Sequence, residues 1–396
     1  MPAQKNIKER IRQFRTCGNA GARHMKLGFG LMRLPVIDGD RRNIDIETFS
    51  KMADIFLASG GRYFDTAYVY HGGESEKAFR KAVVERYPRD AYTVTDKLPL
   101  FVIDSADRME PTFNEQLERC GVGYFDYYWL HSIKDDSYYE KVVRFDAFDF
   151  IKKKKEAGLI KHIGFSFHGS PAMLETILTE HPETEFVQLQ INYIDWEDNN
   201  ICSRECYEIA TRHGKPVIVM EPVKGGALAA VPDAAREIME QRNHGMSPAS
   251  WAIRYAASLD NVMMVLSGMS NEDQVRDNVS YMKDFRPLDG GEKKILEKCG
   301  DIIHSQIAIP CTGCSYCVTE QECPMEIPIP DLFDVYNRKS NYTLSRPDAG
   351  KLYADLTAEA GKAGDCVECG GCEGHCPQHL EIRELLKKVA RSFERH

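Results

Sequence analysis

Short apolar runs alternate with longer amphipathic stretches along most of this chain, from Lys26 to about Asp284. Such alternation is typical of βα units, in which each strand is followed by a helix that covers a parallel sheet. The runs with strand character span residues 27–31, 63–65, 92–95, 127–131, 162–166, 187–191, 217–220 and 262–266. Eight strands, each followed by a helical stretch, close a barrel more readily than they form an open sheet. The pattern therefore predicts an α/β fold, a (β/α)8 TIM barrel, over residues 25–290.

Several helix starts are predicted from capping residues. Ser75 is placed to cap the helix that runs through Ala78 and Val83, and Ser270 or Asn271 to cap the last barrel helix. Pro248 is expected at the start of the preceding helix, where proline is tolerated.

The chain is longer than such a barrel requires, because a (β/α)8 barrel takes about 250 residues and this chain has 396. After Pro287 the pattern changes to a Gly-Gly pair and a short charged helix over 292–299, which is typical of a linker. We therefore predict a second domain over residues 291–396. Residues 1–24 carry basic side chains without the apolar stretch of a secretory signal, and they are predicted to be a surface extension.

Cysteine usage separates the C-terminal part from the rest of the chain. The total is 13, an odd number, and no export signal is recognised. This usage argues against a disulfide framework and favours a reducing, cytoplasmic compartment in which thiols serve as metal ligands. Eight of the cysteines fall in two tight groups: Cys311, Cys314, Cys317 and Cys323, then Cys366, Cys369, Cys372 and Cys376.

Each group has the spacing of an iron–sulfur ligand set. Three cysteines at two-residue gaps hold three corners of a [4Fe-4S] cluster, and a following Cys-Pro supplies a fourth corner, often to the other cluster. Crossed ligation would give Cys376 to the first cluster and Cys323 to the second. Zinc sites usually pair two Cys-x2-Cys knuckles instead. The spacing therefore predicts two [4Fe-4S] clusters.

Charge and hydropathy restrict the partners. The formal net charge is −9, and no long basic stretch is interleaved with aromatic residues, so nucleic acid is not expected as a partner. No run of about 18 apolar residues occurs, so no membrane partner is expected. A small-molecule substrate and a redox partner protein for the clusters are the partners that fit.

Polar residues lie at the C-terminal ends of the predicted strands, where enzymes of this fold place their chemistry. Asp65 ends the second strand, Lys97 follows the third and His131 ends the fourth, while Tyr70 lies in the loop above Asp65. A carbonyl that accepts a hydride becomes an alkoxide and needs a proton donor at its oxygen. A tyrosine, with a pKa near 10, is a poor donor unless a lysine ammonium favours its anion. A histidine beside the oxygen stabilises the developing charge.

These residues lie in motifs that resemble those of the aldo-keto reductases. The motifs are YFDTA at 63–67, Tyr70 followed by ESE at 74–76, VTDK at 94–97 and LHS at 130–132. The resemblance covers residues 26–284 and implies an oxidoreductase with a catalytic tetrad. In that tetrad Tyr70 would be the general acid, Lys97 and Asp65 would tune it, and His131 would orient the substrate.

The same resemblance implies that NADPH or NADH binds across the mouth of the barrel. Ser166 and Gln190 match positions that bond the nicotinamide carboxamide, and Met220 stands where many relatives stack a tyrosine. The adenosine-phosphate loop at the last barrel helix matches Ser267, Gly268, Ser270, Gln274 and Asn278. Many relatives have Lys or Arg where this chain has Ser270, so weak discrimination between NADH and NADPH is expected.

The cysteine-rich tail resembles a bacterial-type dicluster ferredoxin domain. Helical stretches are expected around 332–336 and 351–360, between the two cysteine groups. The tail is therefore predicted to be small, mostly α-helical and ferredoxin-like.

Two functions of different classes fit these residues. The first is an NAD(P)H-dependent reductase of an aldehyde, ketone or quinone-like carbonyl, in which the clusters serve electron transfer or stability. The alternative is an electron-transfer oxidoreductase centred on the clusters, with a flavin in the barrel mouth and a protein redox partner. A relay of that kind would be needed because nicotinamide moves two electrons as hydride and a cluster moves one. The complete tetrad favours the reductase.

Overall fold

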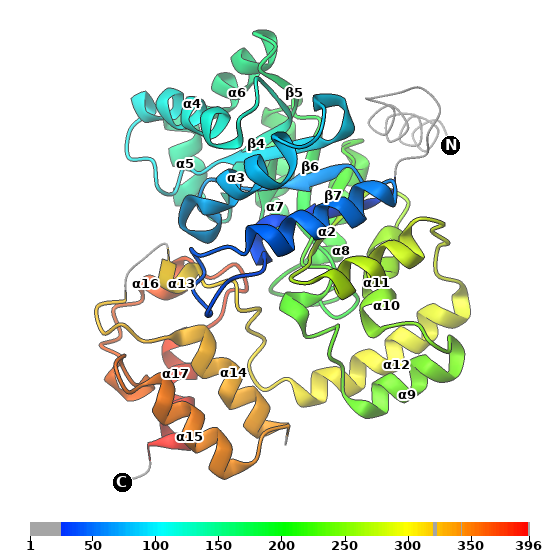
Figure 1. Ribbon diagram of the computed structural model, residues 1–396. Coiled ribbons are helices and arrows are strands. Elements are labelled where there is room, and N and C mark those ends of the chain that lie inside the picture. Colours follow the sequence, from blue (N-terminus) through cyan, green and yellow to red (C-terminus); the bar gives the residue numbers. More distant parts are fainter. Residues whose placement is uncertain (1–24, 320–322, 342, 395–396) are drawn as a thin grey trace. The chain divides into compact units, whose positions relative to one another are not determined.

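Eight parallel strands close a barrel in the computed structural model, which describes residues 25–319, 323–341 and 343–394 (Figure 1). Neighbouring strands pair in chain order, from β1 with β2 through to β8 with β1. The strands are β1 (Leu27–Gly30), β2 (Tyr63–Asp65), β3 (Thr93–Leu98), β4 (Phe125–Ile133), β5 (Ile160–Phe167), β6 (Phe186–Gln190), β7 (Val217–Met220) and β8 (Val262–Gly268). The predicted barrel is confirmed. The predicted extension over residues 1–24, with Cys17, lies outside the described residues.

Helices follow the strands and surround them (Figure 1). The strand β4 is longer than predicted, because it pairs with β5 from Phe125 to Ile133 and is buried throughout. In chain order the helices before the C-terminal part are α2 (Ile46–Ala58), α3 (Glu74–Phe79), α4 (Met109–Cys120), α5 (Asp136–Arg144), α6 (Ala147–Glu156), α7 (Pro171–Glu180), α8 (Ser203–Arg212), α9 (Asp233–Arg242), α10 (Pro248–Ala257) and α11 (Glu272–Met282). Of these, α9 belongs to a second unit and not to the barrel.

Two of the predicted helix starts are confirmed and one is wrong. Asn271 caps α11, since its side chain accepts the backbone N–H of Gln274 at 2.9 Å, and Pro248 is the first residue of α10. Ser75 does not cap α3, because Gly73, with φ of 91°, occupies that position and the helix begins one residue before Ser75. The Ser75 hydroxyl is instead buried and lies 2.9 Å from the Thr66 hydroxyl.

The barrel contains a cluster of large side chains from several strands, so it is a packed core and not a pore. Ring contacts fix this packing, with the ring centroids of Tyr127 and Phe186 5.5 Å apart and those of Trp129 and Phe186 5.4 Å apart. The members are Tyr63, Tyr127, Trp129, Phe186, Ile218, Met263, Met264 and Leu266. Because they fill the interior, a ligand can reach the strands only at the ends of the barrel.

The chain forms two compact units, and the second is not continuous in sequence. Of the residues that the structure describes, the first unit contains those in 25–222 and 249–289, and the second contains those in 223–248 and 290–394. The segment after β7, with α9, therefore belongs to the second unit. There α9 lies against α12 (Gly290–Gln306), with the Asn243 amide donating to Glu292 Oε1 at 2.5 Å and the Cys299 thiol to the Ala235 carbonyl at 3.6 Å.

The C-terminal part of the second unit is helical, as predicted, and no strand occurs among its described residues. Its helices after α12 are α13 (Tyr316–Thr319), α14 (Ile329–Ser340), α15 (Arg346–Leu356), α16 (Gly371–Gly374) and α17 (Ile382–Phe393). Buried side chains of α14, α15 and α17, with cysteines of both groups, form one apolar cluster. The rings of Tyr353 and Phe393 stack within it at 4.6 Å.

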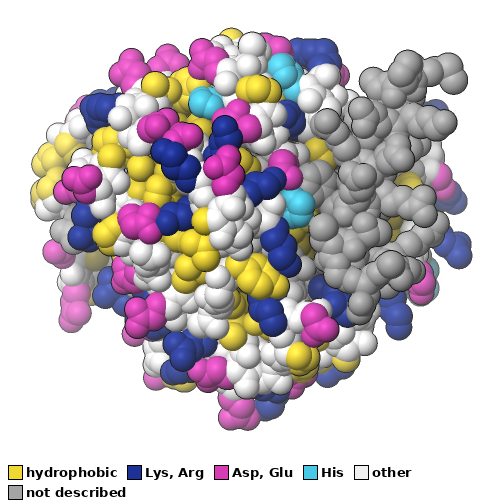
Figure 2. All heavy atoms as spheres, turned by 90° about the horizontal axis from the view of Figure 1, so that it is seen from above, with side chains coloured by type: hydrophobic (Ala, Val, Ile, Leu, Met, Phe, Trp, Pro, Cys, Tyr) yellow, Lys and Arg dark blue, Asp and Glu magenta, His cyan; other side chains and the backbone are white. Residues whose placement is uncertain are grey.

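Charges of both signs are interspersed on the face drawn in Figure 2, among hydrophobic side chains. Within the ranges that the structure describes, no helix has the length and apolar character needed to cross a bilayer. The expectation that nucleic acid is not a partner stays a prediction.

Candidate active site and cluster cavities

The ammonium of Lys97 lies at the centre of the candidate active site, at the end of β3. It donates to both carboxylate oxygens of Asp65, at 3.0 and 2.9 Å, and to the carbonyl oxygen of Thr66 at 2.6 Å. Both charged side chains are buried. Burial alone would lower the pKa of Lys97, but Asp65, Tyr70 and Asp96 together outweigh burial, and the pKa is raised. The ammonium is therefore kept charged beneath the barrel rim.

Tyr70 follows β2 and lies against this ammonium. The distance from Lys97 Nζ to the centre of the Tyr70 ring is 4.7 Å, and Tyr70 is 9 % exposed. The ring of His131 lies nearly perpendicular to that of Tyr70, with centroids 6.1 Å apart. The structure thus brings together all four residues of the predicted tetrad.

The loop that carries Tyr70 is held by a neighbouring histidine. Residues 71–73 all have positive φ, which turns the backbone sharply after Tyr70. The His71 ring bonds the carbonyl oxygen of Arg41 through Nδ1 at 2.6 Å and the backbone N–H of Leu34 through Nε2 at 3.2 Å. Since Nε2 accepts, the proton is on Nδ1, and burial lowers the pKa of His71 in agreement with a neutral ring.

His131 is aimed by an irregularity in β4. The pairing of β4 with β5 shifts register between Leu130 and Ile133, and Ser132 has φ of 61°. The backbone N–H of Ser132 donates to Ser166 Oγ at 2.6 Å, which fixes this bulge. A bulge of this kind redirects the side chains beside it. Ser166, predicted as a cofactor residue, therefore also supports the strand that presents His131.

The imidazole of His131 is held neutral. Burial lowers its pKa well below the usual range, and the charge of Lys97 acts in the same direction. The Phe101 ring lies 5.2 Å from the His131 ring, and the Tyr138 hydroxyl donates to the His131 carbonyl oxygen at 2.6 Å. A neutral ring can donate an N–H to an oxygen that gains negative charge.

The predicted nicotinamide residues lie at the ends of β5, β6 and β7. Ser166 and Gln190 are buried, and Met220 is partly exposed. The Gln190 amide donates to Asp195 Oδ2 at 2.7 Å, so its orientation is fixed by a neighbour that the sequence did not reveal. Three adjacent strand ends thus present a hydroxyl, an amide and a thioether along one side of the rim.

The predicted phosphate residues lie together where β8 leads into α11. Asn278 Nδ2 donates to Ser267 Oγ at 2.7 Å, and the Ser270 N–H donates to Gln274 Oε1 at 2.7 Å. A Cβ atom added at Gly268 would lie 3.2 Å from Arg33 Cδ. The start of α11 is therefore lined by polar groups, which suits a phosphate.

Arg33 is a residue of this region that the sequence did not single out. The Ser270 hydroxyl donates to the Arg33 carbonyl oxygen at 2.8 Å, and Arg33 Nη2 lies 3.9 Å from Glu221 Oε1. Its side chain is 32 % exposed. A basic group therefore lies beside the phosphate loop even though position 270 is serine, and only the fold, across 237 residues, makes it a neighbour.

The eight cysteines of the tail line two cavities in a crossed pattern. One cavity is lined by Cys311, Cys314, Cys317 and Cys376. The other is lined by Cys323, Cys366, Cys369 and Cys372, and Cys317 borders it as well. The remaining lining is mostly apolar, with Ile329 in both, Phe333 in the first and Leu386 in the second. Four thiols around an apolar cavity are the donor set that a [4Fe-4S] cluster requires, so these residues fit the predicted groups.

Comparisons with known proteins agree with this division of the chain. Residues 26–301 match the Aldo/keto reductase family, and residues 310–380 match the 4Fe-4S dicluster domain. The chain is 24 % identical over 302 residues to L-galactose dehydrogenase of Arabidopsis thaliana, covering 72 % of this chain and 92 % of that protein. It is 25 % identical over 278 residues to an uncharacterized oxidoreductase of Schizosaccharomyces pombe, covering 64 % and 80 %.

Solved structures share the barrel. The aldo-keto reductase AKR11C1 from Bacillus halodurans matches with a TM-score of 0.54 and 23 % identity, over 71 % of this chain and 94 % of that one. An aldo-keto reductase from Klebsiella pneumoniae, solved in complex with NADPH, matches with a TM-score of 0.56 and 18 % identity, over 70 % and 91 %. At these identities the likeness establishes the fold.

Proposed function

The chain belongs to the aldo/keto reductase family, and from that premise we propose that it reduces a carbonyl compound with hydride from NAD(P)H, with Tyr70 as the general acid. The observation that carries this proposal is the contact between the Tyr70 ring and a buried ammonium that is itself bound by Asp65. Loss of carbonyl reduction when the Tyr70 hydroxyl is removed is the test.

The proton step follows from the charges around Tyr70. Donation of the phenol proton to a carbonyl oxygen leaves a phenolate, which costs much less beside the Lys97 ammonium than in an uncharged site. Asp65 keeps that ammonium charged and fixes its position. The tyrosine is then a usable acid at neutral pH, although a free phenol is not.

His131 has a different role in the proposed reaction. A neutral imidazole does not compete as a proton donor, because its proton is bound far more tightly than that of an imidazolium. It donates a hydrogen bond to the carbonyl oxygen and so stabilises the negative charge that develops there. The bulge at Ser132 holds the ring in the orientation that this bond requires.

The hydride donor is proposed to bind at the rim residues described above. When bound, the nicotinamide supplies the hydride that reduces the carbonyl carbon. Ser166, Gln190 and Met220 would hold the nicotinamide end, and Ser267, Gly268, Ser270, Gln274 and Asn278 the phosphate end. A Klebsiella pneumoniae structure that shares the fold was solved with NADPH, which supports this placement.

The substrate class is an aldehyde, a ketone or a quinone-like carbonyl. The relative named L-galactose dehydrogenase suggests that the reverse reaction, oxidation of a sugar hydroxyl, belongs to the same chemistry. In that direction the Tyr70 phenolate would accept the hydroxyl proton, since catalysis of a reaction and of its reverse uses the same groups.

Two [4Fe-4S] clusters are proposed for the cysteine cavities. Cys311, Cys314, Cys317 and Cys376 would hold the first, and Cys323, Cys366, Cys369 and Cys372 the second. Such clusters supply one-electron transfer in addition to holding a small domain together. Thiolate ligands need a reducing environment, so we place the enzyme in the cytoplasm.

Coenzyme choice gives a first prediction. We expect Ser270→Arg to increase the affinity for NADPH over NADH about tenfold, because a guanidinium at the start of α11 adds a charge-assisted bond to a 2'-phosphate. The measurement is the ratio of kcat/KM for the two coenzymes. Wild type is expected to discriminate weakly, with Arg33 as its basic group in this region.

The matched control is Ser280→Arg, which adds the same charge to an exposed position of the same helix. It should leave the coenzyme ratio unchanged. Equal effects of the two substitutions would mean that the added charge acts through the general field and not through a phosphate site at residue 270.

A further inference from the structure

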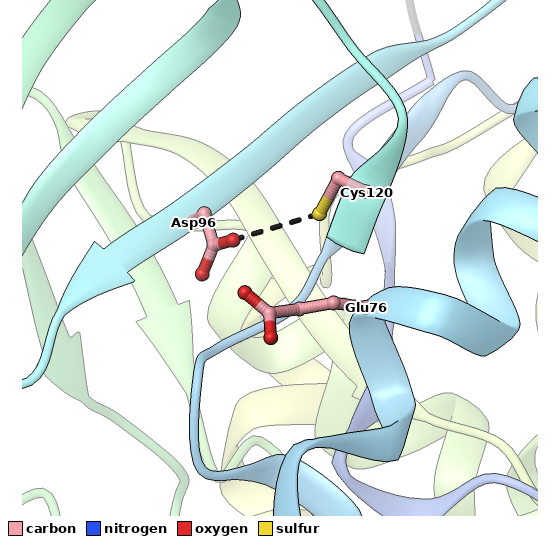
Figure 3. A group of neighbouring side chains, drawn as sticks. All are labelled: Glu76, Asp96 and Cys120. Carbon is pink, nitrogen blue, oxygen red and sulfur yellow. Dashed lines mark hydrogen bonds between the residues drawn. The ribbon is translucent and has the colours of Figure 1, made fainter. Parts of the chain in front are cut away.

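A buried group of two carboxyls and a thiol lies behind the tetrad (Figure 3). Glu76 comes from α3, Asp96 from β3 and Cys120 from the end of α4, and all three are 0 % exposed. One side-chain donor or acceptor atom from each lies within 4.8 Å of the others. Asp96 directly precedes Lys97, so this group is joined to the active site through one peptide bond.

The bonds around the two carboxyls are unequal. Asp96 accepts the backbone N–H of Lys97 at Oδ1, at 2.8 Å, and the Cys120 thiol at Oδ2, at 3.6 Å. Glu76 accepts Arg119 at Oε2, at 3.1 Å. Its other oxygen, Oε1, is buried and receives no donor from the residues that the structure describes.

One carboxylate oxygen of Glu76 and one of Asp96 nevertheless lie within 4.8 Å of each other. Two carboxylates have no proton to offer, and like charges this close and this deeply buried cannot both persist. One proton on Glu76 Oε1 removes the repulsion. The protonated oxygen can then donate a hydrogen bond to the Asp96 carboxylate. A shared proton therefore explains both why the two carboxyls lie so close together and why Glu76 Oε1 receives no donor.

The environment favours this assignment of the proton. Burial raises the pKa of Glu76 well above its usual range, and the charge of Asp96 raises it further. Burial also raises the pKa of Asp96, to about 6, although the bonds from Glu76 and from the Lys97 N–H oppose the rise. Glu76 is therefore the protonated member at neutral pH, and Asp96 is the carboxylate.

We propose that Glu76 and Asp96 hold a single proton between them, and that this pair is a positioning device which fixes the backbone of Lys97 under Tyr70. The role assigned to Lys97 rests on the proposed function, whereas the shared proton does not. The other titratable and charged groups that face the pair are Lys97 on β3, Tyr128 on β4, Cys120 and Arg119 on α4, and Tyr68 before α3, while Glu115 on α4 faces Arg119.

The shared proton has a consequence for stability that identifies it. A carboxyl whose pKa is raised by folding stabilises the protein below its unfolded pKa, and this stabilisation is lost as pH rises toward the folded pKa. Between about pH 5 and pH 7 folding therefore takes up one proton at Glu76. An ionised Glu76 paired with Arg119 would give no such uptake, because it would carry no proton in either state.

Replacing Glu76 by glutamine tests this directly. The amide imitates the protonated carboxyl, since its NH2 donates to Asp96 and its oxygen accepts Arg119. The ratio of the unfolding equilibrium constant of Glu76→Gln to that of wild type should fall about tenfold for each unit of pH increase from 5 to 7. The measurement is the Tm difference between the two full-length, cluster-loaded proteins across that range, which should grow by a few degrees per pH unit in favour of the variant.

Glu115→Gln is the matched control, because Glu115 binds the same guanidinium at 2.6 Å but is 43 % exposed. Its Tm difference from wild type should not change with pH over this range. If Glu76→Gln were less stable than wild type by the same amount at every pH, Glu76 would be an ordinary ion-pair partner and the proposal would be wrong. Stabilisation of wild type, but not of Cys120→Ala, by added Zn²⁺ would also overturn it, since a cation would then replace the proton.

The positioning role has its own readout. Asp96→Ala removes the acceptor of the Lys97 N–H, and we expect kcat for carbonyl reduction to fall about 10- to 100-fold with little change in KM. Asp96→Asn should restore most of kcat, because its amide oxygen can accept the same N–H.

The shared proton and the positioning role can be disproved independently of each other. An Asp96→Ala variant that folds and keeps its kcat would overturn the positioning role. If Glu76→Gln cannot be folded, Asp96→Asn reports on the proton instead, because Glu76 is then free to ionise beside Arg119 and the pH dependence of Tm should shrink. Absence of carbonyl reduction in wild type would remove the proposed function and leave the thermal measurement intact.

Discussion

Tyr70→Phe is expected to lower kcat/KM for carbonyl reduction by at least 10²- to 10⁴-fold, the range that general acid catalysis contributes. The substitution removes one oxygen and leaves the ring that lies 4.7 Å from the Lys97 ammonium. Cofactor binding and thermal stability should therefore change little. Steady-state kinetics with NADPH and a simple aldehyde, a coenzyme titration and a thermal melt would measure these three expectations.

Tyr68→Phe is a control of the same chemical size. Tyr68 lies two residues away, and its hydroxyl donates to Glu115 Oε2 at 2.9 Å, away from the tetrad. Its loss should change kcat/KM by less than a few-fold. A Tyr70→Phe enzyme as active as Tyr68→Phe would exclude Tyr70 as the proton donor.

The double substitution Cys311→Ala/Cys376→Ala is expected to remove one cluster and spare the other. In the crossed arrangement both cysteines line the same cavity, so iron should fall from about eight to about four per chain. Cys366→Ala/Cys376→Ala removes one cysteine from each cavity, so both clusters should be incomplete. The iron content per chain should then be well below four. Iron analysis and the paramagnetic signal of the dithionite-reduced protein measure the outcome.

Uncrossed ligation predicts the reverse order of iron contents for these two double variants, so a single comparison decides between the patterns. Cys202→Ala serves as a control, because Cys202 lies beside α8 and borders neither cavity. It should keep the full iron content. Loss of a cluster should also lower the stability of the helical part of the second unit, since ligand binding and folding are coupled in small metal domains.

Residues whose position follows from local sequence were predictable. The strands β2 and β7 have the predicted bounds, and Asp65, Lys97 and His131 lie at strand ends, because apolar runs of this length are read directly from the sequence. The cysteine spacing likewise predicted the two sets of four cysteines that line the two cavities. In both cases the relevant information lies within a few residues of the group concerned.

Features that depend on distant contacts were not predictable. Arg33 is 237 residues away from Ser270 in the sequence, so no pattern around position 270 could indicate that the two are neighbours. The predicted capping role of Ser75 was wrong because the turn at 71–73 puts Gly73 in the cap position and the helix begins at Glu74. Glu76, Asp96 and Cys120 look unremarkable in sequence, and only the packing of α3 and α4 on β3 brings them together.

The discontinuous second unit has a consequence for how the chain is made. Residues 223–248 leave the ribosome before their partner helix α12, which ends at Gln306. At about 5–20 residues per second, the 58 residues from 248 to 306 take about 3 to 12 seconds to synthesise. Throughout that interval Ala235 and Met239, which are buried in the finished protein, have no covering helix. The segment at 223–248 can therefore complete its buried contacts with α12 only after residue 306 has been synthesised, well after the eight strands of the barrel.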